Sequence, residues 1–245
     1  MPDYLLFLAL LPGILIIIYI FRKDKVEHEP VSLIVKLIVF GAVSCIPAIF
    51  AENYMTAIMP AGLSGVVEYA VYDAFIVAAL CEEVCKYVLL RIGSWNNINF
   101  DYRFDGIVYG VSVAVGFALL ENILYVMDGG IQVALMRGVL AVPLHAFCGV
   151  FMGVFYGAAK RYSVGGRGSK ALSCKVMAIF VPIMIHGLYD TFAMIGSTAA
   201  TVILLVFVVI MYIVAIKCVN KFSREDAMGG FYDYTMPLSD LWRNK

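Results

Sequence analysis

Acidic and histidine side chains inside strongly apolar segments are the residues of this chain whose types and spacing could do chemistry. They occur on four consecutive apolar segments and are Glu82, Glu83, Lys86, Glu121, Asn122, His145, His186 and Asp190. A charged side chain at the middle of a bilayer costs at least about 2.5 kcal/mol to insert, so it usually faces a partner or a water-filled cavity. We therefore expect these groups to face one another in a shared site.

Hydrolysis is the chemistry that this set of side chains suits best. A carboxylate in an apolar site can act as a general base toward water, and a nearby histidine can protonate a leaving amine. Asn122 could donate a hydrogen bond to an oxyanion. Glutamate and histidine are also zinc ligands, which makes Glu83, His145 and His186 a candidate set for zinc. The helical HExxH signature is absent, so the residues allow either a metal-assisted or a metal-free carboxylate mechanism.

Local spacing predicts two of the contacts within this set. Glu82 and Lys86 stand four residues apart and can form an ion pair on one helix face. His186 and Asp190 have the same spacing, so the carboxylate can hold the imidazole in one orientation. Glu83 points about 100° away from Glu82 around a helix, so the two glutamates need not share a role.

The composition indicates that lipid is the solvent for most of the chain. Of its 245 residues, 62% are hydrophobic and only 15% are charged, against about a quarter charged in ordinary soluble domains. The net charge is zero, so nothing indicates a nucleic-acid partner. A spanning helix needs about 20 apolar residues. The segments that approach this length are Tyr4–Phe21, Val31–Ala51, Val66–Leu90, Phe104–Met127, Ile131–Ala159, Leu172–Ile195 and Thr198–Cys218.

These segments predict an all-α, polytopic membrane helix bundle of about seven spans. Lysine and arginine residues gather in every second connection, which predicts an N-terminus outside and a C-terminus in the cytoplasm. We expect residues 1–221 to form a single transmembrane domain, with the catalytic helices at about 66–196. Residues 222–245 are expected to form a cytoplasmic tail.

The depth of the polar residues is similar on all four segments. At about 1.5 Å per residue, they lie about 12–24 Å from the cytoplasmic helix ends, in one slab near the middle of the membrane. The row Gly149, Gly153 and Gly157 has the small-xxx-small spacing that lets helices approach closely. Such packing could bring the polar groups into contact.

The motifs resemble those of one known family. Glu82-Glu83-Val84-Cys85-Lys86 resembles the EExxK motif of the PrsW family of intramembrane proteases, and Phe117 to Asn122 resembles its FxxxEN motif. His145 and the stretch His186 to Asp190 match the two remaining positions. The similarity covers about residues 79–193, with four motifs in the family's order on four successive segments.

The resemblance implies an intramembrane endopeptidase of the cell membrane. Carried over by position, Glu82, Glu83, His145 and His186 would form the catalytic core. Lys86 belongs to the first motif, Glu121 and Asn122 would support the core, and Asp190 would orient His186. The partner that the resemblance implies is a single-span membrane protein such as an anti-sigma factor, cleaved among membrane lipids. The family has been discussed both as metalloproteases, with zinc as the candidate cofactor, and as glutamic-type proteases.

Other interpretations of the same residues remain open at this point. Buried acids and histidines also serve as proton or ion sites in transporters, and a non-enzymatic chaperone or immunity protein of the same superfamily would keep the same motifs. The pair Glu82–Lys86 could be only a neutralised structural ion pair. Asp73 is interpreted as a solvated or capping residue, and Arg137 as a side chain that extends outward to the membrane surface.

Overall fold

The computed structural model describes residues 3–63 and 65–228, and all the regular structure within these ranges is helical. This confirms the all-α prediction. The elements in chain order are α1 (Asp3–Lys23), α2 (Val31–Ala57), α3 (Val66–Tyr72), a π-helical segment η1 (Asp73–Ala79), α4 (Leu80–Ser94), α5 (Asp105–Val139), α6 (Ala141–Val164), α7 (Gly168–Ile195) and α8 (Thr198–Met228). The predicted tail at 222–245 falls largely outside the described residues, and α8 continues through its first part.

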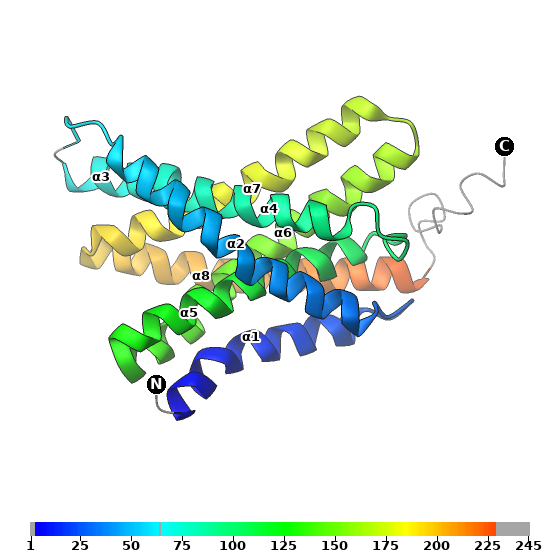
Figure 1. The fold of residues 1–245 in the computed structure, drawn as a ribbon, viewed down its shortest axis with the longest axis horizontal. Helices are drawn as coiled ribbons and strands as arrows, with labels where there is room; N and C mark the ends of the chain where they lie inside the picture. Colours follow the sequence, from blue (N-terminus) through cyan, green and yellow to red (C-terminus); the bar gives the residue numbers. More distant parts are fainter. Residues whose placement is uncertain (1–2, 64, 229–245) are drawn as a thin grey trace.

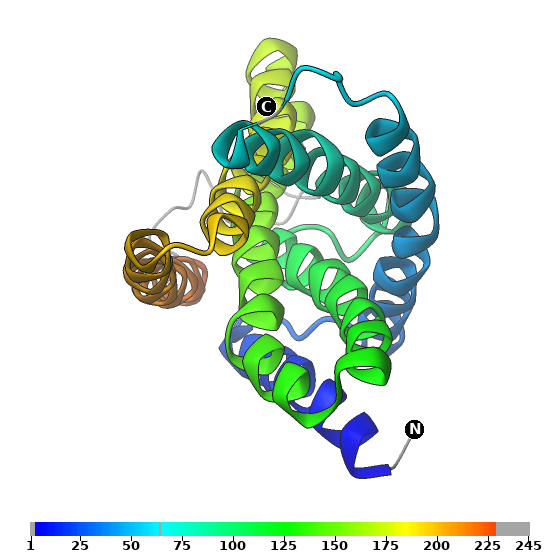
Figure 2. The ribbon, with the colours of Figure 1, turned by 90° about the vertical axis from the view of Figure 1, so that its left-hand side faces the viewer.

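Helix α5 is the centre of the bundle. Every residue from Asp105 to Ala118 is buried, because α1, α2 and α6 all pack along this stretch. A helix that is apolar all round is expected to be enclosed by other helices. Figure 1 shows the helices aligned along one common direction, and the end-on view in Figure 2 shows α8 at the periphery, beside α7.

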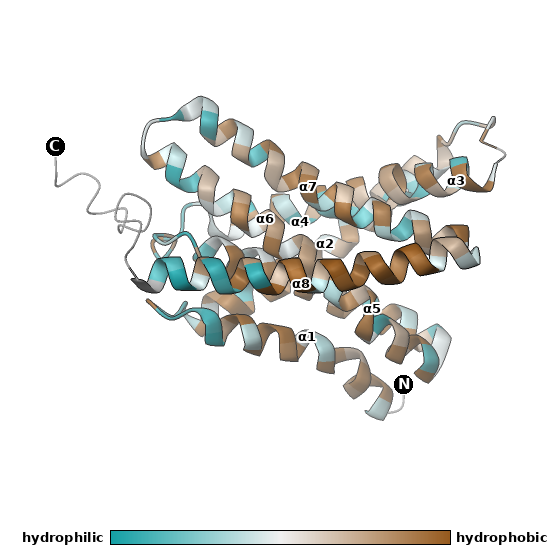
Figure 3. Cartoon of the chain, turned by 180° about the vertical axis from the view of Figure 1, so that it is seen from behind, coloured by the Kyte–Doolittle hydropathy of each residue, from teal (hydrophilic) through white to brown (hydrophobic). Residues whose placement is uncertain are grey.

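The outer helices carry the apolar surface that a lipid environment requires. Helix α8 is strongly hydrophobic over most of its length and becomes polar near its C-terminal end (Figure 3). Within the described residues, five helical ranges are long and apolar enough to cross a membrane, and only 22% of the most apolar window of α1 is buried within the protein. The five ranges are Asp3–Lys23, Val31–Ala57, Asp105–Val164, Gly168–Ile195 and Thr198–Asp226.

The difference between seven predicted spans and five such ranges has a physical origin. The predicted third span corresponds to the continuous run of α3, η1 and α4. The glutamates and Lys86 interrupt its apolar sequence, so this run is not among the five ranges. The predicted fourth and fifth spans fall within the single range Asp105–Val164. Gly130 interrupts the helix there with a φ of 68°, at the position where the sequence predicted a connection. The seven-span count therefore stays a prediction.

Glycines set the close approach of α5 to α6. A Cβ added at Gly106 would lie 2.6 Å from the carbonyl oxygen of Gly153, and Gly110 faces Gly149 in the same way. Backbone atoms cannot move aside as a side chain can, so a larger residue would force the two helices apart. The small-xxx-small row on α6 thus meets a second glycine row on α5, as the sequence suggested.

Gly106→Ala is expected to lower the stability of the protein by about 1–3 kcal/mol, the usual cost of overpacking a tight contact. The measurement is the midpoint of thermal unfolding of the purified protein in detergent. Gly168→Ala is the matched control, because no atom lies within 4 Å of a Cβ built at Gly168. Equal midpoints for the two variants would contradict the close packing of α5 against α6.

Buried acids gather in the connections at the end of the bundle where α1 meets α2. Glu29 is 5% exposed and its Oε2 atom has no hydrogen-bond partner. Burial is the main reason that the pKa of Glu29 is raised to about 8 from an ordinary 4.5; the neighbouring Asp24 and Asp101 act in the same direction, and a contact with Tyr109 acts against it. The folded protein therefore holds a proton on Glu29 that the unfolded chain has already released at neutral pH.

The stability of the protein is accordingly expected to fall as the pH rises. Because the pKa of Glu29 is raised in the folded state, its contribution is complete below about pH 4.5 and is lost as the pH passes through about 8. Glu29→Gln, which mimics the protonated form, is expected to be more stable than the wild type at pH 8.5 by on the order of 1–3 kcal/mol. Thermal melts at pH 5 and 8.5 test this. Glu27→Gln serves as control, because Glu27 is exposed. If the stability of Glu29→Gln depends on pH as strongly as that of the wild type, Glu29 is not the source of the pH dependence.

Candidate active site

The π-helical segment η1 delivers the two glutamates to the centre of the bundle. Such segments often mark functional sites, because the extra residue in the turn re-aims the side chains that follow. It packs against α7 at Gly187, where an added Cβ would collide with the ring of Phe75. This contact brings the start of α4, with Glu82 and Glu83, directly beside His186.

The ammonium of Lys86 lies at the centre of the cluster. Its Nζ atom is 2.9 Å from Glu82 Oε2 and 2.8 Å from Glu83 Oε1. The Glu82–Lys86 ion pair is thereby confirmed. The expectation that Glu82 and Glu83 need not share a role stays a prediction, but the long lysine side chain reaches back to both carboxylates.

His186 lies between two carboxylates. Its Nδ1 atom is 2.9 Å from Glu83 Oε1, and its Nε2 atom is 3.1 Å from Asp190 Oδ2. The predicted contact between His186 and Asp190 is present. Asp190 therefore fixes the ring so that Nδ1 points toward the glutamates.

His145 is oriented in the same way by a different carboxylate. Its Nε2 atom is 2.9 Å from Glu121 Oε2, and its Nδ1 atom is 3.0 Å from Lys86 Nζ. A lysine ammonium can only donate, so Nδ1 of His145 accepts and Nε2 carries the proton that is donated to Glu121. The lone pair of His145 is thus directed into the cluster.

The four central side chains fit a divalent metal ion. Glu82, Glu83, His145 and His186, all buried, each offer one ligand atom, and these atoms lie within 4.8 Å of one another. Both imidazoles direct Nδ1 inward while a carboxylate binds Nε2, which is the usual arrangement around metal-ligating histidines. Glu83 Oε2 is buried without a hydrogen-bond partner, so a ligand position is free. Two nitrogens with carboxylate oxygens are a donor set typical of zinc.

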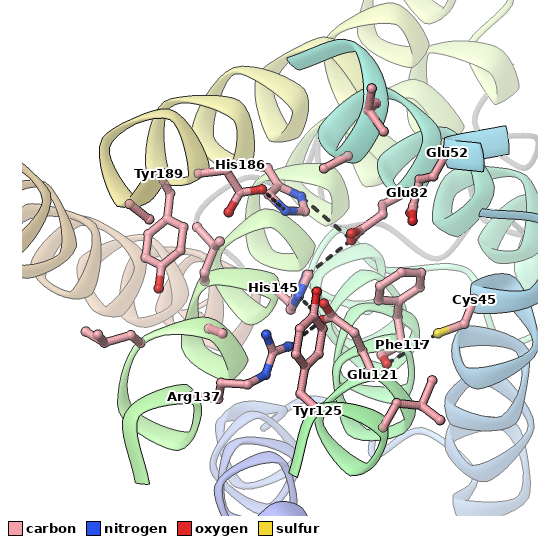
Figure 4. Close-up of a pocket in the computed structure, with 18 of the residues that line it drawn as sticks. Cys45, Glu52, Glu82, Phe117, Glu121, Tyr125, Arg137, His145, His186 and Tyr189 are labelled. Atoms are coloured by element: carbon pink, nitrogen blue, oxygen red, sulfur yellow. Dashed lines mark hydrogen bonds and ion pairs between the residues drawn. The ribbon is translucent and has the colours of Figure 1, made fainter. Parts of the chain in front are cut away.

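A pocket of about 590 Å³ opens onto this cluster. Glu82, His145 and His186 line it, whereas Glu83 lies behind them. Figure 4 shows Glu82 beside the two histidines, with Glu121 next to His145 and Arg137 next to Glu121. The two glutamates therefore differ in their exposure to the pocket, because the side chain of Glu82 lines it and that of Glu83 does not.

The structure corrects the interpretation of Arg137. Its Nη2 atom is 2.8 Å from Glu121 Oε2, and its guanidinium stacks 4.0 Å from the ring centre of Tyr125. It therefore points into the pocket and does not extend outward to the membrane surface. Its position close to the break at Gly130 is what turns it back over Glu121.

Asn122 is buried but does not line the pocket. Its Nδ2 atom donates to the carbonyl oxygen of Ala9 on α1, and its Oδ1 atom accepts from Nε of Arg137. Both ends of the amide are thus engaged away from the cluster. This geometry does not fit the expected role as an oxyanion donor; Asn122 instead holds Arg137 in place.

Two further acids line the pocket that sequence reasoning did not assign to the site. Glu52 was expected in a connection after Ala51, but α2 continues to Ala57 and carries Glu52 on its last turns. Asp73 lies within the continuous run from α3 to α4, so its side chain lines the pocket and does not cap a helix. The signal that could have found Glu52 is the helical periodicity continuing to Ala57.

Comparison with known proteins identifies the family of the chain. Residues 29–216 match the model of the PrsW family of intramembrane metalloproteases. The chain is 35% identical to Protease PrsW of Geobacillus kaustophilus over 73% of its own length and 75% of the relative. It is 32% identical to Protease PrsW of Oceanobacillus iheyensis over 87% and 94%, and 35% identical to that of Bacillus subtilis over 73% and 78%. No solved structure matches. The chain therefore belongs to the PrsW family of intramembrane metalloproteases and is a multi-pass membrane peptidase.

Proposed function

We propose that this peptidase cleaves a single-span, membrane-tethered protein, such as an anti-sigma factor, with Glu82 as the general base. The observation that carries the proposal is the convergence of Glu82, Glu83, His145 and His186 at a pocket inside an apolar helix bundle. The family membership supports the reaction class, and the placement of the pocket supports a substrate that is reached from within the membrane.

The unequal access of the two glutamates supports different roles. Glu82 lines the pocket and can receive a proton from a water molecule next to a bound peptide. Glu83 is fully buried and contacts His186 and Lys86, which suits a ligand or positioning role. Once protonated, Glu82 is also placed to return the proton to the leaving amine.

Glu83, His145 and His186 are the residues that would hold the metal ion, in line with the ligand types found in the sequence. When bound, a divalent ion supplies Lewis-acid polarisation of the scissile carbonyl and makes water a stronger nucleophile. Glu121 and Asp190 hold the two imidazoles in the orientation that directs Nδ1 inward. Arg137, which lines the pocket, secures Glu121 from the other side.

The remaining walls of the pocket suit an extended, apolar peptide segment. They are formed largely by Ile49, Leu124, Met136, Leu140, Leu144, Ala193 and Met194. A pocket of this size accommodates a few residues of an extended chain, as ligand-sized cavities of about 300–1,000 Å³ do. A substrate drawn from a transmembrane segment, locally unwound, has the matching chemistry.

We further propose that the bundle crosses the membrane seven times, with the N-terminus outside and the C-terminus in the cytoplasm. This is supported by the basic residues at the α1–α2 and α6–α7 connections and by the helical order. A cysteine placed at Gly62 is then labelled only from outside the cell and one placed at Gly166 only from the cytoplasm. Labelling of both from the same side would refute this topology.

The test of the proposed function is cleavage of single-span substrates by the purified protein in liposomes, with the cut site located by mass spectrometry. Glu82→Gln, Glu83→Gln, His145→Ala and His186→Ala are each expected to abolish cleavage. Glu225→Gln is the control, because Glu225 pairs with Lys221 on α8, far along the chain from the cluster. Undiminished cleavage by all four site variants would refute the site assignment. Ion flux through the wild-type protein that the same four substitutions abolish would instead favour a transporter.

A further inference from the structure

Lys86 is fully buried, and all three of its N–H groups are used within the metal-ligand cluster. Nζ donates to Glu82 Oε2 at 2.9 Å, to Glu83 Oε1 at 2.8 Å and to His145 Nδ1 at 3.0 Å. The ring of Phe117 packs against the ammonium, with the ring centre 3.9 Å from Nζ. A buried ammonium with this environment is held tightly, since leaving it unpaired would be costly.

The atoms that Lys86 binds are the atoms that a metal ion would need. A carboxylate oxygen has more than one lone pair and can bind a metal ion and a lysine together. An imidazole nitrogen has a single lone pair, and that of His145 Nδ1 is directed at Nζ. The other nitrogen of His145 donates to Glu121, so the ring cannot offer a second lone pair in this orientation.

Charge leads to the same conclusion. Two carboxylates, Glu82 and Glu83, face one another through the ammonium of Lys86, which offsets part of their repulsion. A divalent ion at the same point would offset both charges and repel an ammonium left beside it. The lysine and the metal ion are therefore alternative counter-cations for one set of donors.

We propose that Lys86 is a built-in competitor for the metal: it holds Glu82, Glu83 and His145 together until the ion binds, and the ion must displace its ammonium from His145 Nδ1. This regulation rests on the metal-binding role given to the same residues under the proposed function. Glu83 Oε2, buried without a partner, can receive the displaced ammonium, so a small movement of the lysine side chain suffices. Phe117 keeps the ammonium nearby in both arrangements.

The experiment compares the affinity of the full-length protein for Co²⁺ after metal removal in detergent, followed by the visible absorption of the bound ion. Lys86→Met and Lys86→Gln are expected to bind Co²⁺ at least about tenfold more tightly than the wild type, because removing a competing state raises the competent fraction. Lys160→Met is the matched control, since Lys160 donates to the carbonyl of Trp95, away from the cluster, and its affinity should equal that of the wild type. Equal or weaker binding by both Lys86 variants would show that Lys86 supports the metal and does not compete with it.

Folding of the variants is controlled by a second measurement on the same samples. The rise in unfolding temperature on saturation with Zn²⁺ is expected to be larger for both Lys86 variants than for the wild type, and an equal or smaller rise counts against the proposal. The cleavage assay keeps the two proposals separate. If the wild type cleaves the substrate but the Lys86 variants bind metal more weakly, only the competition is overturned. If the Lys86 variants bind metal more tightly but the wild type cleaves no substrate, only the proposed substrate is overturned.

Discussion

Glu82→Gln is expected to lower kcat for peptide-bond cleavage by about 10²–10⁴-fold while the protein retains its metal. A positioned general base contributes about this factor. The glutamine keeps the size of the side chain and its hydrogen bond with Lys86 but cannot accept a proton from water. Because Glu83 and the two histidines are unchanged, the ligand set that would hold the ion stays complete.

The measurement combines single-turnover cleavage with metal content on one preparation of the Glu82→Gln variant. Tyr125→Phe provides a pocket control, because it changes a lining residue without removing a group that contacts the four central side chains. If Glu82→Gln cleaves at the wild-type rate, Glu82 is not the general base. Loss of the metal together with activity would instead make Glu82 a ligand.

Glu83→Gln is expected to lose the metal and also to destabilise the metal-free protein by about 3–5 kcal/mol, the usual cost of breaking a buried, hydrogen-bonded ion pair. Glu83 Oε1 contacts both Lys86 Nζ and His186 Nδ1, and the side chain is fully buried. The substitution leaves the lysine with one carboxylate and replaces the carboxylate beside Nδ1 of His186 with a neutral amide. The two consequences are measured by metal analysis and by thermal unfolding.

Glu52→Gln is the matched control for this second prediction. Glu52 lines the same pocket, but the structure gives it no ion pair or hydrogen bond with the four central side chains. It is expected to retain full metal content. A Glu83→Gln protein with unchanged metal content and stability would show that Glu83 is neither ligand nor buried partner, and the distinction between the two glutamates would fail.

The contacts within single helices could be predicted from the sequence, because helix geometry alone determines them. Residues four apart lie on one face, which is why the pairs Glu82–Lys86 and His186–Asp190 are found as expected. The contact between Glu83 and Lys86 was not predicted, although the same helix geometry allows it. Direction around the helix was considered, but the reach of Lys86 to both the third and the fourth preceding residue was not.

The contacts between helices depended on features that periodicity does not encode. Glu121 meets His145 because α5 and α6 pack at their glycines, and His186 meets Glu83 because η1 packs on Gly187. The motif order on successive segments indicated that these residues share a site, but it did not say which atoms meet. The tautomer of His145 follows only from the atoms observed beside it.

Arg137 and Glu52 were misplaced because each lies close to an irregular end of a helix, and the role of Asn122 was missed because it depends on Arg137. The break at Gly130 returns Arg137 over Glu121, and Asn122 is then engaged by Arg137 and by α1. Helix α2 continues past the point where its apolar run weakens and brings Glu52 to the pocket. Helix boundaries are the least certain part of a sequence-based prediction, and here they affect the walls of the site more than its centre.

The central claim is that Glu82, Glu83, His145 and His186 form one metal-dependent proteolytic site. The most direct test measures metal content and cleavage of a single-span substrate on the same purified sample, before and after chelation and after the ion is restored. We expect chelation to remove metal and cleavage together, and restoration to return both in the wild type but neither in Glu83→Gln. Full cleavage by wild-type protein from which the metal has been removed would contradict the account.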